Sequence, residues 1–167
     1  CLLEAGHDVV VVDNLCNSTA DSIARVAKLA GRPFSLVVGD VRDRALLKQV
    51  FCDHGFDAVM HFAGLKAVGE SVKDPAIYFD NNVGGSLALL QTMQEFGVHR
   101  VVFSSSATVY GEPKELPLKE TSQVGPTTNP YGRSKLMVEE IMSDLARVDS
   151  RWAIGVLRYF NPIGAHA

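Results

Sequence analysis

Short apolar runs alternate along this chain with longer segments whose apolar residues recur at intervals of three and four. Valine-rich runs bounded by polar residues and glycine are typical of buried parallel strands, whereas the longer spacing indicates helices with one buried face. The expected strands cover 9–12, 34–38, 58–62, 101–103 and 154–159. A helix is expected over 23–30, where Gly31 breaks the pattern, and another between its possible cap Asp43 and Gly55. Two more are expected over 75–96, with Asp74 as the cap, and over 130–147, and residues 2–7 look like a last helical turn that Gly6 stops.

Strands that alternate with helices in this order predict right-handed βαβ units. They therefore predict an α/β fold, a Rossmann-like doubly wound parallel sheet. In such sheets, ligands bind outside the carboxyl ends of the strands. Polar and functional residues follow each expected strand, at Asp13, Asp40, 62–64, 104–108 and 159–161. Their concentration predicts a binding site along that edge.

Composition narrows the classes of partner. The chain has 167 residues, of which 47% are hydrophobic, and a formal net charge of −3. No apolar run approaches the ~20 residues needed to cross a bilayer, so a membrane partner is not expected. The basic residues are scattered rather than clustered, so nucleic-acid binding is not expected either. The three cysteines lack metal-type spacing. We therefore expect free thiols, no bound metal and a cytoplasmic protein.

The segment that begins at Pro130 carries a candidate catalytic pair. Asn129 is expected to be the N-cap, with Pro130 at the first helical position, where its missing N–H costs nothing. Tyr131 and Lys135 are then four residues apart on one helix face. The apolar stripe of the same helix, which includes Val138, falls on that face. The pattern therefore directs the phenol and the ammonium toward the sheet.

The chemistry of this pair depends on ionisation of the phenol. A free tyrosine titrates near ~10, which is too high for a base at neutral pH. A nearby ammonium, the helix N-terminus and a cationic nicotinamide ring all favour the phenolate. A hydroxyl of Ser106 or Thr108 would hold a substrate oxygen beside it, so that a proton leaves an alcohol while hydride leaves the same carbon. Tyr-x-x-x-Lys also begins ordinary surface helices, but the serine-rich segment upstream favours catalysis.

Residues at other strand ends indicate a dinucleotide. Asp13 closes an all-valine strand, where dinucleotide folds place the acid that binds the adenine ribose, and its charge favours NAD over NADP. Asp40 would accept from the adenine amine, and Ala63-Gly64 would let the backbone approach a pyrophosphate or ribose. Each has a structural alternative, respectively a turn aspartate, a turn cap and a tight strand exit.

Three other polar residues lie inside expected elements. Asn81 and Asn82 occupy the middle of an expected helix, where asparagine is a poor former, and this suits a ligand contact. His61 lies inside an expected strand, and we interpret it as a core histidine rather than a catalyst.

Five strings of the sequence resemble the nucleotide-sugar epimerases of the extended short-chain dehydrogenase/reductase family, the UDP-glucose 4-epimerases among them. They are residues 13–18, 61–71, 104–111, 130–137 and 157–162, so the resemblance covers essentially the whole chain. The Tyr-x-x-x-Lys pattern belongs to the whole superfamily, whereas Phe-Ala-Gly-Leu-Lys-Ala at 62–67 looks specific to the epimerases.

The resemblance implies a role for each matching residue. Tyr131 would be the general base that takes the sugar 4′-hydroxyl proton, and Lys135 would bind the nicotinamide ribose and favour the phenolate. Ser106 and Thr108 would align the sugar. The implied NAD contacts are Asp13, Asn14, Asn17, Ser18, Asp40, Val41, Phe62, Ala63, Gly64, Lys66, Asn81, Ser106, Tyr131, Lys135 and Phe160. The implied substrate contacts are Lys66, Ser106, Ala107, Thr108, Tyr131, Tyr159 and Asn161.

The activity that the resemblance implies is the interconversion of UDP-galactose and UDP-glucose. Hydride leaves sugar C4 for NAD⁺, and the 4-keto sugar turns in the pocket and takes hydride back on its other face. The reaction is therefore redox-neutral. Related 4,6-dehydratases need a carboxylate pair after their active-site threonine. No carboxylate follows Thr108 before Glu112, which argues against dehydration.

Other activities fit the same resemblance. An epimerase or reductase acting on another UDP-sugar is the first alternative. A non-catalytic NAD-binding protein of the same fold is the second, and its expected sign would be the loss of Tyr131 or Lys135, both of which are present.

The family's first strand and glycine-rich loop are expected before Cys1, and its substrate domain after Ala167. We therefore expect residues 1–167 to form a partial NAD-binding Rossmann domain. The first strand lies in the middle of the family's sheet, so without it two half-sheets with open edges would remain. The chain alone is then expected neither to hold NAD nor to turn over. A homodimer is expected from the family only.

Overall fold

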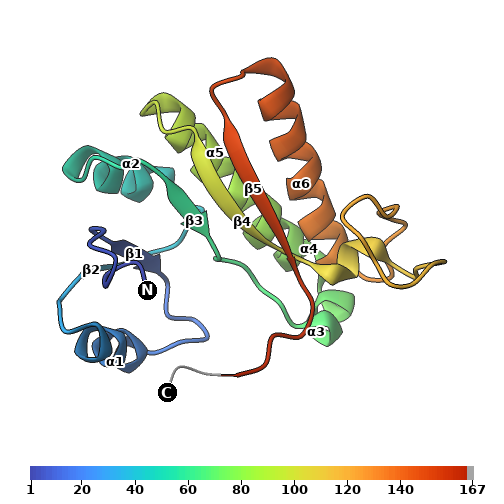
Figure 1. Cartoon of the computed structure of the whole chain (residues 1–167), viewed down its shortest axis with the longest axis horizontal. Coiled ribbons are helices and arrows are strands. Elements are labelled where there is room, and N and C mark those ends of the chain that lie inside the picture. The colour runs from blue at the N-terminus through green and yellow to red at the C-terminus, as the bar shows by residue number, and fades with distance from the viewer. Residues whose placement is uncertain (165–167) are drawn as a thin grey trace.

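A computed structural model describes residues 1–164, so the last three residues of the domain expected over 1–167 lie outside it. Figure 1 shows an α/β chain in which every expected strand is present. The strands are β1 (Val10–Asp13), β2 (Ser35–Val38), β3 (Val59–His61), β4 (Arg100–Ser106) and β5 (Ala153–Tyr159). The helices are α1 (Ala20–Ala30), α2 (Arg44–Asp53), α3 (Val68–Lys73), α4 (Pro75–Tyr78), α5 (Gly85–Glu95) and α6 (Pro130–Val148).

The strands form two separate parallel sheets. β1 pairs with β2 in one, and the other has the order β3–β4–β5. Parallel neighbours need a crossover, and helices supply it, α1 between β1 and β2 and α6 between β4 and β5. The parallel α/β arrangement is therefore confirmed, and its division agrees with the expected half-sheets. Within each sheet the carboxyl ends of the strands lie on one edge.

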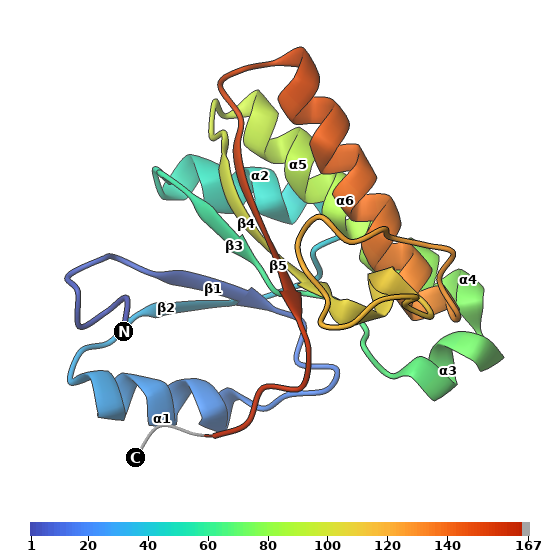
Figure 2. The same ribbon diagram turned by 45° about the vertical axis from the view of Figure 1, so that its right-hand side comes forward.

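The core lies on one face of the three-stranded sheet. Figures 1 and 2 show α5 and α6 running along that face, and α2 packs against α5. Val138 and Met142 of α6 are each 1% exposed, as the apolar stripe predicted. The buried cluster is Leu47, Phe51, Ala88, Leu89, Leu90, Met93, Val98, Val101, Phe103, Val138, Met142 and Trp152.

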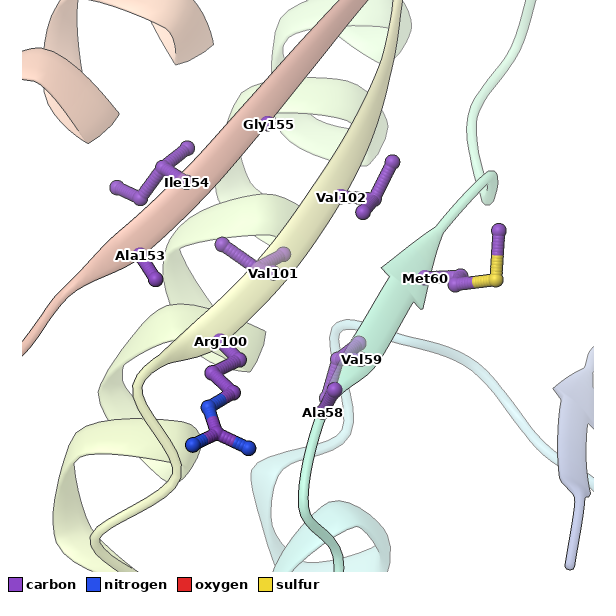
Figure 3. Close-up of a pocket in the computed structure, with 9 residues that line it drawn as sticks. All are labelled: Ala58, Val59, Met60, Arg100, Val101, Val102, Ala153, Ile154 and Gly155. Carbon is purple, nitrogen blue, oxygen red and sulfur yellow. The ribbon is translucent and has the colours of Figure 1, made fainter. Parts of the chain in front are cut away.

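The opposite face of the same sheet is open. Successive strand residues point to opposite faces, so Val101 and Phe103 are buried while Val102 faces away from the helices. Figure 3 shows this face, where Met60, Val102 and Gly155, which pair across the three strands, are among the residues that line a shallow hollow of about 380 Å³.

Helix α1 runs beside the two-stranded sheet, as Figure 2 shows. No residue of β1, α1 or β2 is buried. Helix α1 ends at Gly31 in the left-handed conformation, as its sequence predicted. The β1–α1–β2 unit therefore forms its elements with little core of its own.

Strand β4 is longer than expected. It does not end at Phe103, because Ser104, Ser105 and Ser106 continue the ladder opposite Leu157, Arg158 and Tyr159. The backbone pairing with β5 outweighs the weak strand preference of serine. The hydroxyls therefore belong to the last residues of a paired strand rather than to the loop after it.

The long helix expected over 75–96 is interrupted. Helix α4 passes into a π-helical segment, Phe79–Gly84, before α5 begins, and the unexpected helix α3 precedes them. Asp74 caps α4 as expected, accepting a hydrogen bond from the amide of Ile77. A π-helical turn widens the helix by one residue, and such turns are frequent at functional sites.

Candidate active site

Helix α6 begins as its sequence predicted. The Asn129 side chain accepts a hydrogen bond of 2.8 Å from the Gly132 amide, and Pro130 is the first helical residue. Tyr131 is partly exposed, whereas Lys135, one turn further on, is only 5% exposed. The same helix face thus carries a phenol that solvent can reach and an ammonium that is enclosed.

Lys135 has an unusual environment. Its Nζ donates a hydrogen bond of 2.9 Å to the carbonyl of Ser104, and it lies 4.9 Å from the ring centroid of Phe103 and 6.0 Å from that of Tyr131. Burial lowers the pKa of Lys135 from 10.5 to about 8, because removal from water penalises the charged form. The ammonium is still the main form at neutral pH, and it faces the tyrosine ring.

The hydroxyls of Ser106 and Thr108 lie together. Thr108 Oγ1 donates to Ser106 Oγ at 3.0 Å, and the Thr108 amide approaches the same oxygen at 3.3 Å. Gly132 packs against this turn, since a Cβ added there would lie 3.2 Å from Thr108 Oγ1. The first turn of α6, which carries Tyr131, therefore stands directly beside the two hydroxyls.

The loop after β3 passes close to Lys135. A Cβ added to Gly64 would lie 3.5 Å from Lys135 Nζ and 3.2 Å from Asn82 Oδ1. The contact with Lys135 would be an ordinary one, whereas the contact with the Asn82 oxygen would be tight, so glycine keeps the close approach to Asn82 open. The approach of this backbone to a pyrophosphate or ribose, which the sequence predicted for Ala63-Gly64, stays a prediction.

Asn82 fixes that loop. Its Oδ1 accepts from the Leu65 amide at 2.8 Å, and its Nδ2 donates to the Leu65 carbonyl at 2.9 Å and to Ser134 Oγ at 3.0 Å. Asn81 Nδ2 also donates to Asn82 Oδ1. Asn82 is 3% exposed and its side chain holds protein groups on both sides. Asn82 therefore links the loop after β3 to α6 through hydrogen bonds. In the sequence, the only sign of this role was an asparagine in the middle of an expected helix, where asparagine is unfavourable.

His61 is a core residue, as interpreted from the sequence. Its Nε2 lies 2.8 Å from Ser86 Oγ, which in turn donates to the Asn82 carbonyl. Burial, and next the charge of Lys135, lower the pKa of His61 from 6.5 to about 3. The imidazole is therefore neutral beside the buried ammonium.

A second polar cluster lies at the carboxyl ends of β1 and β2. Asp13 Oδ1 accepts from the Leu15 amide at 2.7 Å and from Ser18 Oγ at 2.9 Å. Asn14 Nδ2 donates to Asp40 at 3.2 Å. Hydrogen bonds from Arg42 hold the pKa of Asp40 well below its usual range. The turn structure weighed for Asp13 and Asp40 is thus present, and it leaves both carboxylates at the sheet edge.

Arg42 connects the two clusters. Its Nη1 lies 2.5 Å from Asp80 Oδ2, and its Nη2 lies 2.7 Å from Asp40 Oδ2. Val41 packs so closely on Gly85 that a side chain there would collide with it. The end of the two-stranded sheet is therefore held against the π-helical segment that carries Asn82.

The remaining residues of the predicted site are more open. Lys66, Ala63 and Asn17 are exposed, and so are Tyr159, Phe160 and Asn161 at the end of β5. Ala107, Val41 and Asn81 are partly buried. Tyr159 pairs with Ser106 across the sheet, which brings it to the hydroxyl cluster. Phe62 is 55% exposed. These side chains lie around the carboxyl ends of the strands and do not enclose a cavity there.

A comparison with models of protein families identifies the family of this chain. The model of the NAD dependent epimerase/dehydratase family matches residues 1–167. The chain belongs to the NAD dependent epimerase/dehydratase family. The extended dehydrogenase/reductase resemblance seen in the sequence is thereby confirmed at the level of the family.

Relatives within the NAD dependent epimerase/dehydratase family include a UDP-glucose 4-epimerase of Neisseria meningitidis serogroup C, 54% identical over 99% of this chain and 49% of its own length. A UDP-glucose 4-epimerase from Bifidobacterium longum, solved with NAD⁺ and UDP, has a TM-score of 0.97 and 53% identity over 99% of this chain and 49% of its own.

A third relative comes from Stenotrophomonas maltophila. This UDP-glucose-4-epimerase, solved with NAD and formylated UDP-arabinopyranose, has a TM-score of 0.96 and 49% identity, again over 99% of this chain and 49% of its own. The chain thus spans about half the length of the relatives it matches. Among residues 1–164, no helix is both long and apolar enough for a membrane span, and no group of three metal-type side chains is found.

Proposed function

We propose that the protein interconverts UDP-galactose and UDP-glucose, with NAD as its cofactor. The observation that carries the proposal is the enclosed Lys135, its Nζ 6.0 Å from the Tyr131 ring centroid. The paired hydroxyls of Ser106 and Thr108 lie beside the same helical turn. A base, a cation and two oxygen-aligning groups are what removal of a sugar hydroxyl proton requires. The epimerases at 53% and 54% identity support the same reaction.

The residues present fit a dinucleotide. Gly64 leaves space beside Lys135 that a Cβ would fill, and Asp13 presents a carboxylate at the end of β1. A carboxylate at this position suits ribose hydroxyls and repels a 2′-phosphate, which favours NAD. The proposed NAD contacts are those expected from the sequence: Asp13, Asn14, Asn17, Ser18, Asp40, Val41, Phe62, Ala63, Gly64, Lys66, Asn81, Ser106, Tyr131, Lys135 and Phe160.

Each residue of the proposed site then has its own role in the reaction. Tyr131 takes the proton of the sugar 4′-hydroxyl, and the Lys135 ammonium stabilises the phenolate that does so. Ser106 and Thr108 hold the sugar oxygen, with Lys66, Ala107, Tyr159 and Asn161 as further substrate contacts. NAD, when bound, supplies a reversible hydride acceptor. Since proton and hydride both return to the sugar, the reaction consumes no external oxidant.

A second candidate function is an epimerase of another UDP-sugar. The Stenotrophomonas maltophila relative, 49% identical, was solved with a pentose derivative rather than a hexose. The proposed substrate contacts Tyr159 and Asn161 are exposed, so they constrain the sugar weakly within residues 1–164. A reductase of UDP-sugars would instead consume external NAD(H). A non-catalytic NAD-binding protein would neither epimerise a UDP-sugar nor consume NAD(H).

The test incubates the complete protein that contains these residues with UDP-galactose and no added NAD. Formation of UDP-glucose supports the proposal, whereas a stoichiometric change at the nicotinamide absorbance band would favour the reductase. UDP-N-acetylgalactosamine and UDP-arabinose assayed in parallel measure sugar breadth. Protein that retains NAD but converts none of the sugars would contradict catalysis.

The chain by itself is proposed to be inactive, as part of an NAD-binding domain over 1–167. Its Asp13 cluster and its Lys135 cluster stand on two sheets that share no strand pairing. We therefore expect the isolated chain to bind no NAD, measured by calorimetry, and to convert no UDP-galactose. A sharp cooperative melt together with an NAD-induced rise in Tm would contradict this.

Compartment and assembly belong to the same proposal. Cys1, Cys16 and Cys52 are all exposed and free, which suits a reducing compartment such as the cytoplasm. A homodimer is expected from the family alone, and light scattering of the complete protein would measure it.

A further inference from the structure

A buried ion pair lies behind the candidate active site. Glu139 of α6 is 9% exposed, and the Arg158 side chain of β5 is 23% exposed. Arg158 Nη2 lies 2.7 Å from Glu139 Oε2, and its Nε lies 3.2 Å from both carboxylate oxygens. This is a two-pronged pairing with directional hydrogen bonds rather than a loose surface contact.

Three more groups complete the cluster. Ser105 donates a short hydrogen bond to Glu139 Oε1. Arg158 Nη1 donates to the Tyr110 hydroxyl at 3.0 Å and approaches the Glu120 carbonyl at 3.4 Å. The guanidinium also lies 4.9 Å from the Tyr110 ring centroid. The cluster thereby joins α6, β4, β5, the 3-10 helix Ala107–Tyr110 and the loop that follows it.

Three members of the cluster lie next to residues of the proposed site. Ser105 precedes Ser106, Arg158 precedes Tyr159, and Glu139 lies one turn after Lys135. Ser105 pairs with Arg158 and Ser106 with Tyr159 across the sheet, so each pair shares a face. The first pair faces α6, because both side chains bond to Glu139. The second pair is the next residue along each strand, at the sheet edge where Ser106 meets Thr108.

We propose that Glu139, through its pairing with Arg158 and Ser105, is a positioning residue for the reaction. It holds the ends of β4 and β5 at a fixed place relative to the helix that carries Tyr131 and Lys135. The inference rests on the proposed epimerase function. Its chemical reason is that hydride and proton transfer need the sugar oxygen aligned with the phenol, and a displacement of about 1 Å can cost about 10²-fold in rate.

The key variant is Glu139→Gln in the complete protein. The amide keeps the shape and one acceptor for Ser105 but loses the charge and the two-pronged pairing. We expect kcat for UDP-galactose, per NAD-loaded active site, to fall at least about 10-fold, while KM and bound NAD stay within about twofold. Glu140→Gln is the matched control, because Glu140 is the next residue on α6 and is exposed.

Two readouts separate positioning from a purely structural role. The first is single-turnover reduction of the bound NAD by substrate, which follows the chemical step alone and should slow as much as kcat. The second is Ser105→Ala, which frees β4 from Glu139 but leaves the ion pair intact. It should lower kcat by a smaller factor with little change in Tm, and it keeps the test decisive should Glu139→Gln fail to fold.

The outcomes are distinguishable. If the wild-type protein converts no UDP-sugar, the proposed function fails before this inference is reached. If wild type is active and both variants keep kcat per loaded site within twofold, the positioning role is wrong. The positioning role is equally wrong if activity falls only in proportion to the loss of folded protein or bound NAD.

Discussion

The two sheets of this molecule differ in how completely the chain stabilises them. Around β3–β4–β5, twelve residues form a continuous buried cluster with α2, α5 and α6. Around β1–β2, no residue of either strand or of α1 is buried. Both regions follow the same βαβ pattern in the sequence. The local sequence pattern therefore specifies the strands and helices of both sheets. Only around β3–β4–β5 are there enough packed helices to bury the apolar faces of these elements.

The difference divides the proposed chemistry as well. Tyr131, Lys135, Ser106 and Thr108 stand on the well-packed region, and Asp13 and its neighbours stand on the open one. A catalytic constellation must be held rigidly, whereas a cofactor brings contacts of its own when it binds. Substitutions in the first region should therefore change the rate, and those in the second should change cofactor retention.

The largest expected effect comes from Tyr131→Phe in the complete protein. Without the hydroxyl the sugar proton has no acceptor, so kcat should fall by about 10²–10⁴ while Tm and bound NAD hardly change. Steady-state epimerisation measures this. Asp13→Asn is the counterpart in the open region, expected to weaken NAD retention more than kcat. Near-normal turnover in Tyr131→Phe would mean that the base is misassigned.

Core truncations compare the packing of the regions directly. Leu90 in α5 is 2% exposed, so Leu90→Ala should cost about 2–5 kcal/mol in unfolding free energy. Leu36 in β2 is only partly buried, and Leu36→Ala should cost less than about half as much. Urea unfolding of the complete protein that contains these residues gives both values. Equal losses would show that β2 is as well packed in solution as α5.

The pH dependence of stability probes Lys135. Its pKa is about 8 in the folded chain against 10.5 in the reference state, so between these values the unfolded chain binds more protons. Stability should therefore rise with pH across that window, by about 3 kcal/mol at most, while below pH ~8 the full burial penalty applies.

Lys135→Met should abolish that rise, as measured by denaturant unfolding of the protein at several pH values. Lys28→Met, on the exposed surface of α1, removes a lysine from the open region and is the control. If Lys135→Met and wild type give parallel pH profiles, the lysine is not buried as described.

The smallest expected effect concerns helix caps. Asp43 accepts hydrogen bonds of 3.0 Å from the amides of Ala45 and Leu46, so Asp43→Ala should cost about 1 kcal/mol. Thr19, the N-cap of α1, makes no such bond, and Thr19→Ala should cost only a few tenths. Thermal unfolding of the two variants compares them, and a larger loss for Thr19→Ala would reverse the ranking of the regions.

Many features of the fold and of the proposed site could be predicted from the sequence alone. The strand and helix periods, the Asn129 and Asp43 caps, and the Gly31 stop depend on neighbouring residues, so the sequence predicted each of them. The spacing of Tyr131 and Lys135 placed both on one face of a helix whose apolar stripe is indeed buried. The long strings at 61–71 and 130–137 carried the resemblance to the family.

Features made by residues far apart in the sequence were decided only by the tertiary structure. Asn82 holds Leu65 and Ser134, seventeen and fifty-two positions away. Glu139 holds Ser105 and Arg158 from two different strands. The extension of β4 to Ser106, the π-helical segment and the unequal burial of the sheets likewise depend on which distant groups meet. Local pattern fixed the elements because it acts through neighbours, whereas those contacts exist only once the backbone has brought the partners together.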